Sequence, residues 1–464
     1  MLEHLNPTRV FYYFEQLCAI PHGSGNTKAI SDYCVGIAAK LGLEVTQDEW
    51  NNVLIRKPAA KGYENHPTVI IQGHLDMVCE KDADCDLNFM QDGLRLQVDG
   101  DWVFAGQTTL GGDDGIAVAM ALAVLEDKEL PAPAIEALFT TDEETGMDGA
   151  VGLDCSNIRG RLLLNIDSEE EGVLTVGCAG GARVDVTFPL KTQEGQGKGY
   201  IVEVVGLRGG HSGVEIGTGR YNANNVMGKF LQTLGPITLC EIEGGTKDNA
   251  ITRSCRAVIM TQADVVSAAR QFVKENYNAN DPDFNIVVKE MGAQKGYNAD
   301  AVIRFLATVP CGVTTMSADI EGLVETSLNL GILSLKDGQV KGRFSVRSGI
   351  NAKRDALCSR VMRLAEDCGG DTQKGSEYPA WEYRKKSPLQ DTMIAVYQNM
   401  YGKKPQVLTI HAGLECGLFC EKMDGLDAVS FGPNIEEIHT SRERLSISST
   451  ARTYDYLRQI LKEL

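Results

Sequence analysis

The sequence contains no long apolar run, and this absence limits where the protein can act. None of its hydrophobic segments approaches the roughly 20 residues of a membrane-spanning helix. Residues 1–6 lack the basic and apolar regions of a signal peptide. We therefore expect a cytoplasmic protein with no membrane partner.

Positive charge is also scarce. The 464 residues include 45 Lys and Arg against 63 Asp and Glu, which gives a formal net charge of -18. Nucleic acids and anionic lipids would be repelled by this excess of negative charge, so we expect neither as a partner. The same excess suits a protein that attracts cations.

The cysteines do not form the pattern of a disulfide scaffold. There are thirteen, an odd number, and they are scattered, mostly inside apolar runs. This indicates a reduced cytosolic protein. Cys416 and Cys420 are four residues apart, which fits one face of a helix better than a structural zinc site, because no second pair accompanies them.

The apolar residues that are present predict an α/β fold. Residues 135–139 and 162–166 are continuous apolar runs, as expected for strands that helices cover on both faces. In the middle of the chain, segments in which apolar and polar residues alternate replace these runs. We expect a mixed-sheet domain of residues 1–182 plus 385–464. Residues 183–384 would form an inserted α/β domain, long enough for two lobes.

Acidic residues and histidines follow the predicted strands of the first domain. Open α/β sheets place their sites at the carboxyl ends of strands, so we expect these groups to meet. The chain has only seven histidines. The segments concerned are Gly73-His74-Leu75-Asp76, Gly112-Asp113-Asp114-Gly115, Asp142-Glu143-Glu144-Thr145, Asn165-Ile166-Asp167-Ser168 and, far downstream, Ile438-His439-Thr440.

Each segment alone admits a plainer explanation. Asp113 and Asp114 could complement the N-terminus of the following helix. A phosphate loop is disfavoured there, because the acidic groups would repel phosphate and no Lys follows. Glu143 and Glu144 could belong to an acidic surface loop, and His439 could be an exposed histidine.

Taken together, the segments offer a mixed imidazole and carboxylate ligand set for two metal ions. Asp76 stands two residues after His74, where it could orient the imidazole ring. Glu143 neighbours Glu144, so one of the pair could bind metal while the other takes a proton from the attacking water. The candidate ligands are His74, Asp113, Glu144, Asp167 and His439.

This order of motifs resembles the co-catalytic di-zinc metallopeptidases of the carboxypeptidase-G and peptidase-T type. Segments 73–78, 108–111, 140–147 and 411–417 narrow the resemblance to the aminoacyl-histidine dipeptidases, also called peptidase D. The similarity covers essentially the whole chain. Many relatives carry Asp-Lys-Gly where this chain has Asp114-Gly115, a departure that leaves the preceding aspartate unaffected.

The resemblance implies roles in a di-zinc catalytic domain. His74 and Asp167 would bind one zinc ion, Glu144 and His439 the other, and Asp113 would bridge them. Mn²⁺ or Co²⁺ can substitute in such sites. Glu143 would be the general base and Asp76 the residue that orients His74. The resemblance also implies a cis peptide bond between Asp113 and Asp114.

The resemblance further makes the inserted region a lid that binds substrate. His211 lies in Gly209-Gly210-His211-Ser212-Gly213, the segment whose histidine polarises the scissile carbonyl in relatives. Asn249, Arg347, His411 and Gly413 match positions that hold the substrate. An arginine suits a peptide C-terminal carboxylate because its planar fork can donate two parallel hydrogen bonds.

The expected function is the hydrolysis of unblocked dipeptides, including Xaa-His and carnosine-like ones, by a metal-bridging hydroxide with Glu143 as base. An N-acyl amino acid deacylase on the same fold is an alternative, as is a non-catalytic binding relative. A homodimer stays open, and with it whether His211 serves its own chain. The length of the insertion favours the same chain.

Overall fold

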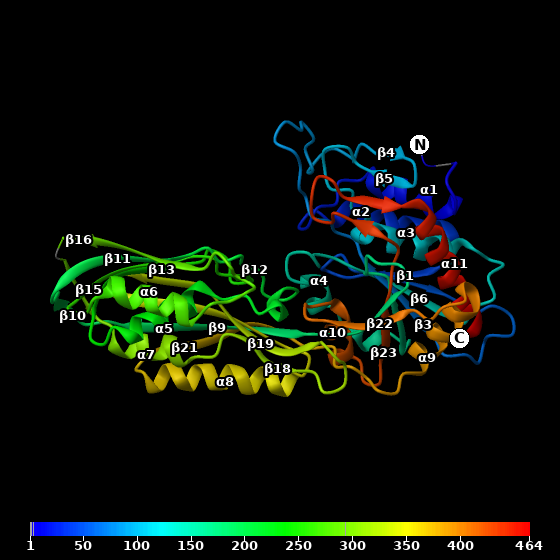
Figure 1. Ribbon diagram of the computed structural model, residues 1–464. Helices are drawn as coiled ribbons and strands as arrows, with labels where there is room; N and C mark the ends of the chain where they lie inside the picture. Colours follow the sequence, from blue (N-terminus) through cyan, green and yellow to red (C-terminus); the bar gives the residue numbers. More distant parts are fainter. Residues whose placement is uncertain (1, 3, 293) are drawn as a thin grey trace. The chain divides into compact units, whose positions relative to one another are not determined.

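The computed structural model describes residues 2, 4–292 and 294–464 and divides into two compact units (Figure 1). The boundaries fall at 177/178 and 382/383, close to the expected 182/183 and 384/385. Residues 410–413 differ from the expectation, because they pack with the inserted unit. Unit 1 comprises Met1–Gly177, Tyr383–Thr409 and Leu414–Leu464, and unit 2 comprises Cys178–Glu382 and Ile410–Gly413.

Unit 1 is built on an eight-stranded mixed sheet in the order β1-β2-β6-β3-β7-β23-β8-β22. The central strands β6, β3, β7 and β23 run parallel, and β1 and β2 add an antiparallel edge. All residues of β3 and β6 are buried, as the continuous apolar run of residues 135–139 predicted for β6. The bounds are β1 Glu44–Gln47, β2 Val53–Lys57, β3 Val69–His74, β6 Ile135–Thr140, β7 Leu162–Asn165, β8 Val173–Cys178, β22 Gln406–Ile410 and β23 Asp427–Ser430.

The helices of unit 1 enclose the core between themselves and this sheet. After its first turn, residues 116–125 of the central helix α3 are all apolar, and the helix packs on both α1 and β3. Helix α2 ends at Gly42, whose φ of 70° lies in the left-handed region that glycine adopts without strain. The helices are α1 Thr8–Cys18, α2 Lys28–Leu41, α3 Gly112–Glu126, α4 Asp148–Gly152, α9 Pro388–Tyr401, α10 Glu415–Lys422 and α11 Ile447–Glu463.

A smaller sheet completes unit 1. It has four strands in the order β24-β25-β5-β4 and joins a hairpin near residue 100 to the C-terminal loop. Helix α11 starts directly after it, with the Ser446 side chain accepting the Ser449 N–H. The bounds are β4 Gln97–Asp99, β5 Trp102–Phe104, β24 Ile435–Glu436 and β25 Arg444–Ser446.

A single eleven-stranded sheet runs through unit 2, so the two expected lobes share one sheet. Burial alternates along β9 and β11, as their sequence patterns predicted. Figure 1 shows helices α5, α6, α7 and α8 around this sheet. The path of the sheet is β16 Asn285–Met291, β11 Lys198–Val205, β15 Cys255–Thr261, β13 Thr238–Gly244, β19 Val324–Lys336, β20 Gln339–Ser348, β9 Gly180–Pro189 and β21 Asp371–Tyr378, with β10 Thr192–Glu194, β17 Lys295–Asn298 and β18 Gly312–Met316 beside it.

Unit 2 has its own hydrophobic core, formed where its helices meet the sheet. Helix α5 begins after Asn222, whose side chain accepts the N–H groups of Asn224 and Asn225. The two-stranded pair β12 Gly210–His211 and β14 Ala250–Ile251 stands beside the main sheet. The helices are α5 Ala223–Thr233, α6 Val265–Glu275, α7 Asp300–Thr308 and α8 Asn351–Asp367.

The mixed-sheet α/β fold expected from the sequence is confirmed. The assignment of unit 1 as the catalytic domain and of unit 2 as a lid remains a prediction. Across the part of the chain that is described, no helix combines the length and the apolar character needed to cross a membrane.

Candidate functional site

The predicted metal ligands of unit 1 stand where parallel strands end at one edge of the sheet. His74 is the last residue of β3, Glu143 and Glu144 lie in the turn after β6, and Asp167 follows β7 by two residues. Asp113 lies at the start of α3. The fifth ligand, His439, lies in the loop between β24 and β25. Neighbouring parallel strands carry their carboxyl ends to the same edge, which brings these groups together.

Asp113 lies at the centre of the cluster and faces both histidines. Its Oδ1 is 3.2 Å from His74 Nε2, and its Oδ2 is 3.3 Å from His439 Nε2. On one side His74 Nε2 is 3.8 Å from Asp167 Oδ1, and on the other His439 Nε2 is 3.1 Å from Glu144 Oε1. The structure therefore brings all five predicted ligands together, in two groups that share one carboxylate.

The cluster holds more negative than positive charge in a largely buried place. Burial raises the pKa of Asp167 well above its usual range, and the nearby Asp113 adds to the shift. Burial also raises the pKa of Glu143 to about 8, with further contributions from the carboxylates of Glu415 and Glu144. Asp167 Oδ2 is buried without a hydrogen-bond partner among the described residues. Such an arrangement is stabilised by cations, and its imidazole and carboxylate donors fit two divalent metal ions.

Histidine protonation responds to the same carboxylates. Hydrogen bonds to Asp113 and Glu144 raise the pKa of His439 to about 10, although its side chain is 46% exposed. The pKa of His74 also lies well above its usual range, because hydrogen bonds to Asp113 and Asp76 outweigh the burial that lowers it. A metal ion and a proton would therefore compete for these ring nitrogens.

Asp76 supports the cluster in a way that its spacing from His74 did not reveal. His74 Nδ1 is 3.0 Å from the backbone oxygen of Asp76 and 3.5 Å from its carboxylate Oδ1. The carboxylate accepts the N–H groups of Glu143 at 3.1 Å and Glu144 at 3.3 Å, and the Ser24 hydroxyl at 2.7 Å. Asp76 thus holds both the imidazole ring and the turn that carries the two glutamates.

Asp114 has a backbone role beside the cluster. Its buried Oδ2 accepts the His74 N–H at 3.1 Å, and burial raises its pKa well above its usual range. The peptide bond between Asp113 and Asp114 is cis, as expected. The contacts of the two adjacent aspartates differ: Asp113 faces the histidines, and Asp114 holds the end of β3. Because Asp114 also lies within reach of His74 and Asp167, the structure leaves it as a further candidate ligand.

Glu443 is a supporting residue that the sequence did not reveal. Its side chain is 3% exposed, and it accepts the N–H groups of Leu110 and Gly112, both at 2.8 Å. Longer contacts reach the N–H groups of Gly111 at 3.3 Å and Asp113 at 3.4 Å. One carboxylate thereby holds the turn that presents Asp113, and no local pattern signals a pairing between segments so far apart in the chain.

A second buried carboxylate links the strands that carry the site. Glu415 accepts the Gln72 amide N–H and the Thr140 hydroxyl, both at 2.7 Å, and so joins β3 to β6. Asn165 of β7 donates to Gln72 Oε1 at 2.5 Å. Burial raises the pKa of Glu415 to about 7. The sequence placed Glu415 in a conspicuous motif but gave no sign of these partners.

The predicted substrate residues of unit 2 also come together. His211 in β12 pairs with β14, and the Ser212 N–H donates to the Asn249 backbone oxygen at 2.8 Å. Gly213 allows a close approach, because a Cβ there would lie 2.7 Å from the His411 oxygen and 2.9 Å from His211 Cε1. These contacts join His211, Asn249 and His411 in one group.

Arg347 and Gly413 belong to the same group. Burial lowers the pKa of His411 to about 4 and also lowers that of His211, and the positive charge of Arg347 contributes to both shifts. His411 Nε2 lies 2.8 Å from Ser327 Oγ. A Cβ at Gly413 would lie 2.8 Å from a ring carbon of Tyr378, the tyrosine whose hydroxyl accepts a hydrogen bond from Arg347 Nη1. His211 and the four predicted substrate residues are thus neighbours, and their roles remain predictions.

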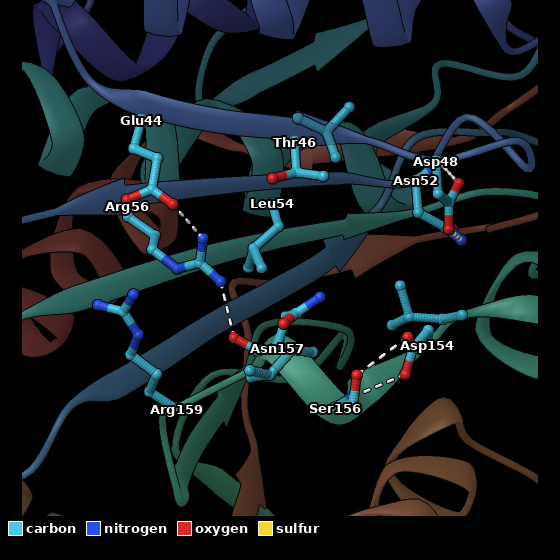
Figure 2. A pocket seen from close by; sticks show the side chains of 13 residues that line it. Glu44, Thr46, Asp48, Asn52, Leu54, Arg56, Asp154, Ser156, Asn157 and Arg159 are labelled. Carbon is cyan, nitrogen blue, oxygen red and sulfur yellow. Dashed lines mark hydrogen bonds and ion pairs between the residues drawn. The ribbon is translucent and has the colours of Figure 1, made fainter.

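A cavity of about 610 Å³ lies elsewhere in unit 1, along β1 and β2 (Figure 2). None of the predicted site residues lines it. Its Arg56 is already paired with Glu44 and Glu136 and donates to the Asn157 backbone oxygen. Because Arg56 pairs with both Glu44 and Glu136, these residues do not form a second cluster of unpaired metal-ligating groups.

Comparison with known proteins shows what this chain is similar to. The family model described as "Peptidase family M20/M25/M40" matches residues 70–463. The cytosol non-specific dipeptidase of Escherichia coli is 36% identical over 481 residues, which cover 100% of this chain and 99% of the relative. The crystal structure of aminoacylhistidine dipeptidase from Vibrio alginolyticus superposes with a TM-score of 0.93 at 36% identity and covers 100% of this chain and 98% of that one. Aminopeptidase PepT from Bacillus cereus, at 18% identity and a TM-score of 0.62 over 99% of both chains, shares the fold.

Proposed function

This chain belongs to peptidase family M20/M25/M40, and we propose that it is a di-zinc dipeptidase that hydrolyses unblocked dipeptides, including Xaa-His and carnosine-like ones. The resemblance seen in the sequence motifs is confirmed by this membership and by the two relatives at 36% identity. One of these is named a non-specific dipeptidase and the other an aminoacylhistidine dipeptidase. Their names support dipeptides as the substrate class.

The observation that carries the proposal is the position of Asp113 between two histidines. Its two oxygens point to different imidazoles, as a carboxylate shared by two metal ions would. His74 and Asp167 would hold one ion, and Glu144 and His439 the other. Zinc suits this mixture of nitrogen and oxygen donors, and Mn²⁺ or Co²⁺ could replace it. When bound, the ions supply a Lewis acid for the peptide carbonyl and lower the pKa of the attacking water.

Glu143 would move the proton. Its backbone N–H and that of Glu144 are both held by Asp76, which fixes the turn while the two side chains do different work. Glu143 would take a proton from water and pass it to the leaving amine. In unit 2, His211 would polarise the carbonyl and Arg347 would bind the C-terminal carboxylate, with Asn249, His411 and Gly413 holding the substrate.

The partners and the location are part of the proposal. Small dipeptides would be the substrates, with neither nucleic acid nor membrane as partner. The cytoplasm is the proposed location, which the word "cytosol" in the name of the Escherichia coli relative supports. A homodimer would be tested by sedimentation of the purified chain.

Metal analysis and a substrate panel test the proposal together. Protein purified without chelator should carry close to two metal ions per chain, lose activity with a chelator and regain it with zinc. Free dipeptides should be cleaved in preference to their N-acetylated forms. Preference for the N-acetylated forms would favour a deacylase instead, and full activity of metal-free protein would refute the di-zinc mechanism.

A further inference from the structure

Arg347 is a cation that has no anionic partner among the described residues. No carboxylate there forms an ion pair with it, and the one side-chain hydrogen bond it makes within this part of the chain runs from Nη1 to the Tyr378 hydroxyl oxygen at 2.8 Å. Its Nε is buried and lacks any hydrogen-bond partner within the described part of the chain. Buried polar atoms in proteins are normally hydrogen-bonded, so the unpartnered Nε leaves this half-buried guanidinium able to receive an anion.

The neighbours of Arg347 do not supply that anion. His211 and His411 lie close enough for the guanidinium to lower the pKa of each, so both are held in the uncharged form at neutral pH. Tyr378, which accepts the hydrogen bond from Arg347, is a neutral hydroxyl whose pKa is raised by burial. Of Arg347, His211, His411 and Tyr378, only the arginine is therefore charged at neutral pH.

The sheet register explains how Arg347 and Tyr378 meet. Gly181 of β9 is directly opposite Arg347 of β20 on one side and Tyr378 of β21 on the other. Residues opposite one another in a sheet point to the same face. A Cβ at Gly181 would lie 2.3 Å from Tyr378 Cζ, so only glycine leaves room for the tyrosine ring to lean across β9 toward Arg347.

The direction of the hydrogen bond leaves one proton unused. Arg347 has only donors, so the Tyr378 oxygen must be the acceptor. The hydroxyl hydrogen of Tyr378 is then free to donate, and no acceptor for it is found among the described residues. Contacts with Gly181 and Gly413 on the ring fix where this hydroxyl sits.

We propose that Tyr378 is a specificity-determining residue, whose hydroxyl donates to the same C-terminal carboxylate that Arg347 binds. The inference rests on the proposed function, because it takes the anion to be the free carboxylate of a dipeptide. Arg347 would supply the charge, and Tyr378 a second, directional donor. Together they would select substrates with a free carboxylate over their C-terminal amides.

Equilibrium binding isolates this role from catalysis. The zinc-loaded Glu143→Ala variant should bind an Xaa-His dipeptide without cleaving it, and calorimetry would compare that dipeptide with its C-terminal amide. Adding Tyr378→Phe removes only the hydroxyl. We expect affinity for the free dipeptide to fall about 10- to 100-fold, as for a hydrogen bond to a charged group, and affinity for the amide to change less than about twofold. In the active enzyme, KM should rise by a similar factor with kcat little changed.

Two further variants serve as the negative and the positive control. Tyr277→Phe alters an exposed tyrosine of the same unit, 70% exposed, and should leave both affinities unchanged. Arg347→Ala should abolish the preference for the free carboxylate. The ratio of the two affinities does not depend on the folded fraction, so partial unfolding cannot imitate the expected result.

The outcomes are distinct. An unchanged ratio of the two affinities in Tyr378→Phe would overturn the proposal. A merely structural tyrosine would give this result, because its loss would weaken the binding of both ligands equally. Failure of the Glu143→Ala parent to bind any dipeptide would also overturn it. If the parent binds with the expected ratio but the wild-type chain cleaves no dipeptide, the proposed hydrolysis fails while the role of Tyr378 stands.

Discussion

In unit 1 carboxylates surround two histidines, whereas in unit 2 two histidines flank an arginine that has no carboxylate partner among the described residues. The pKa of histidine is consequently shifted in opposite directions in the two units. Hydrogen bonds to Asp113 and Glu144 raise the pKa of His439 to about 10, while burial and Arg347 lower that of His411 to about 4. A histidine in this chain therefore indicates little by itself. Its surroundings decide whether it suits a metal ion or a neutral contact with substrate.

The metal-ligand cluster of unit 1 and the residues around Arg347 in unit 2 are also held in place differently. In unit 1, carboxylates outside the ligand set accept backbone N–H groups next to the ligands: Asp76 those of Glu143 and Glu144, and Glu443 those of the turn before Asp113. In unit 2, glycines leave room for Tyr378. Fixed backbone segments suit a metal site, whose donors must keep their separation. A packed ring suits the recognition of one end of a substrate.

The largest expected effect separates two adjacent residues of unit 1. Glu143→Ala should lower kcat by about 10²- to 10⁴-fold, the usual contribution of a general base, while metal content stays at the wild-type level. Glu144→Ala should instead reduce the bound metal, because Glu144 Oε1 faces His439 at 3.1 Å. Metal analysis and steady-state kinetics on both variants make the comparison. Activity of Glu143→Ala within tenfold of wild type would contradict its role as base.

The sequence predicted the parts of the molecule that local pattern determines. Continuous apolar runs located the strands β6 and β7, and alternation located β9 and β11. The five metal-ligand candidates could be found because each stands in a short motif just beyond a strand or in a distinctive loop. The family resemblance then supplied the candidates in unit 2, which composition and periodicity alone would have left as a turn histidine and a strand arginine.

The sequence did not predict the residues whose partners are distant. Glu443 accepts N–H groups more than 300 positions away, and Glu415 reaches Gln72 across a similar separation. Tyr378 was missed for another reason: β21 is a polar edge strand, whose composition gives neither an apolar run nor a clear alternation. Long-range polar contacts become visible only when the fold brings the segments together.

Substitution of Glu443 should have a smaller effect on the metal-ligand cluster. Replacing it by alanine would leave buried N–H groups of Leu110 and Gly112 without their acceptor and loosen the turn that presents Asp113. We expect zinc affinity to fall about 10- to 100-fold, the usual effect of losing a residue that supports metal ligands. Glu443→Gln keeps one acceptor oxygen and should lose less. Equal zinc affinity in wild type and Glu443→Ala, measured by competition with a chelator, would refute this support.

Proton release would sharpen the contrast between the histidines of the two units. The raised pKa values of His74 and His439 mean that both rings are protonated near pH 7 when no cation competes. Metal ligation needs neutral imidazole, so zinc binding should release a proton from each ring, in addition to any held by the buried carboxyl groups, and zinc affinity should weaken as pH falls. Calorimetry in buffers of different ionisation enthalpy measures the number. His439→Ala should release about one proton fewer, and release independent of this substitution would contradict the assignment.

The last expected effect concerns His411, whose pKa is shifted in the opposite direction to that of His439. Its folded pKa of about 4 lies below the ordinary value of 6.5, so the unfolded chain takes up a proton between these two pH values while the folded chain does not. The contribution of this group to stability is therefore present above pH 6.5 and is lost as pH falls toward 4. From the size of the shift, we expect a loss of up to about 3 kcal/mol between pH 7 and pH 4.5. His411→Gln cannot take up this proton, so urea unfolding with chelator present should show a smaller acid destabilisation for the variant than for wild type. Parallel losses in the two proteins would mean that His411 is not held neutral in unit 2, and the contrast with His439 would then fail.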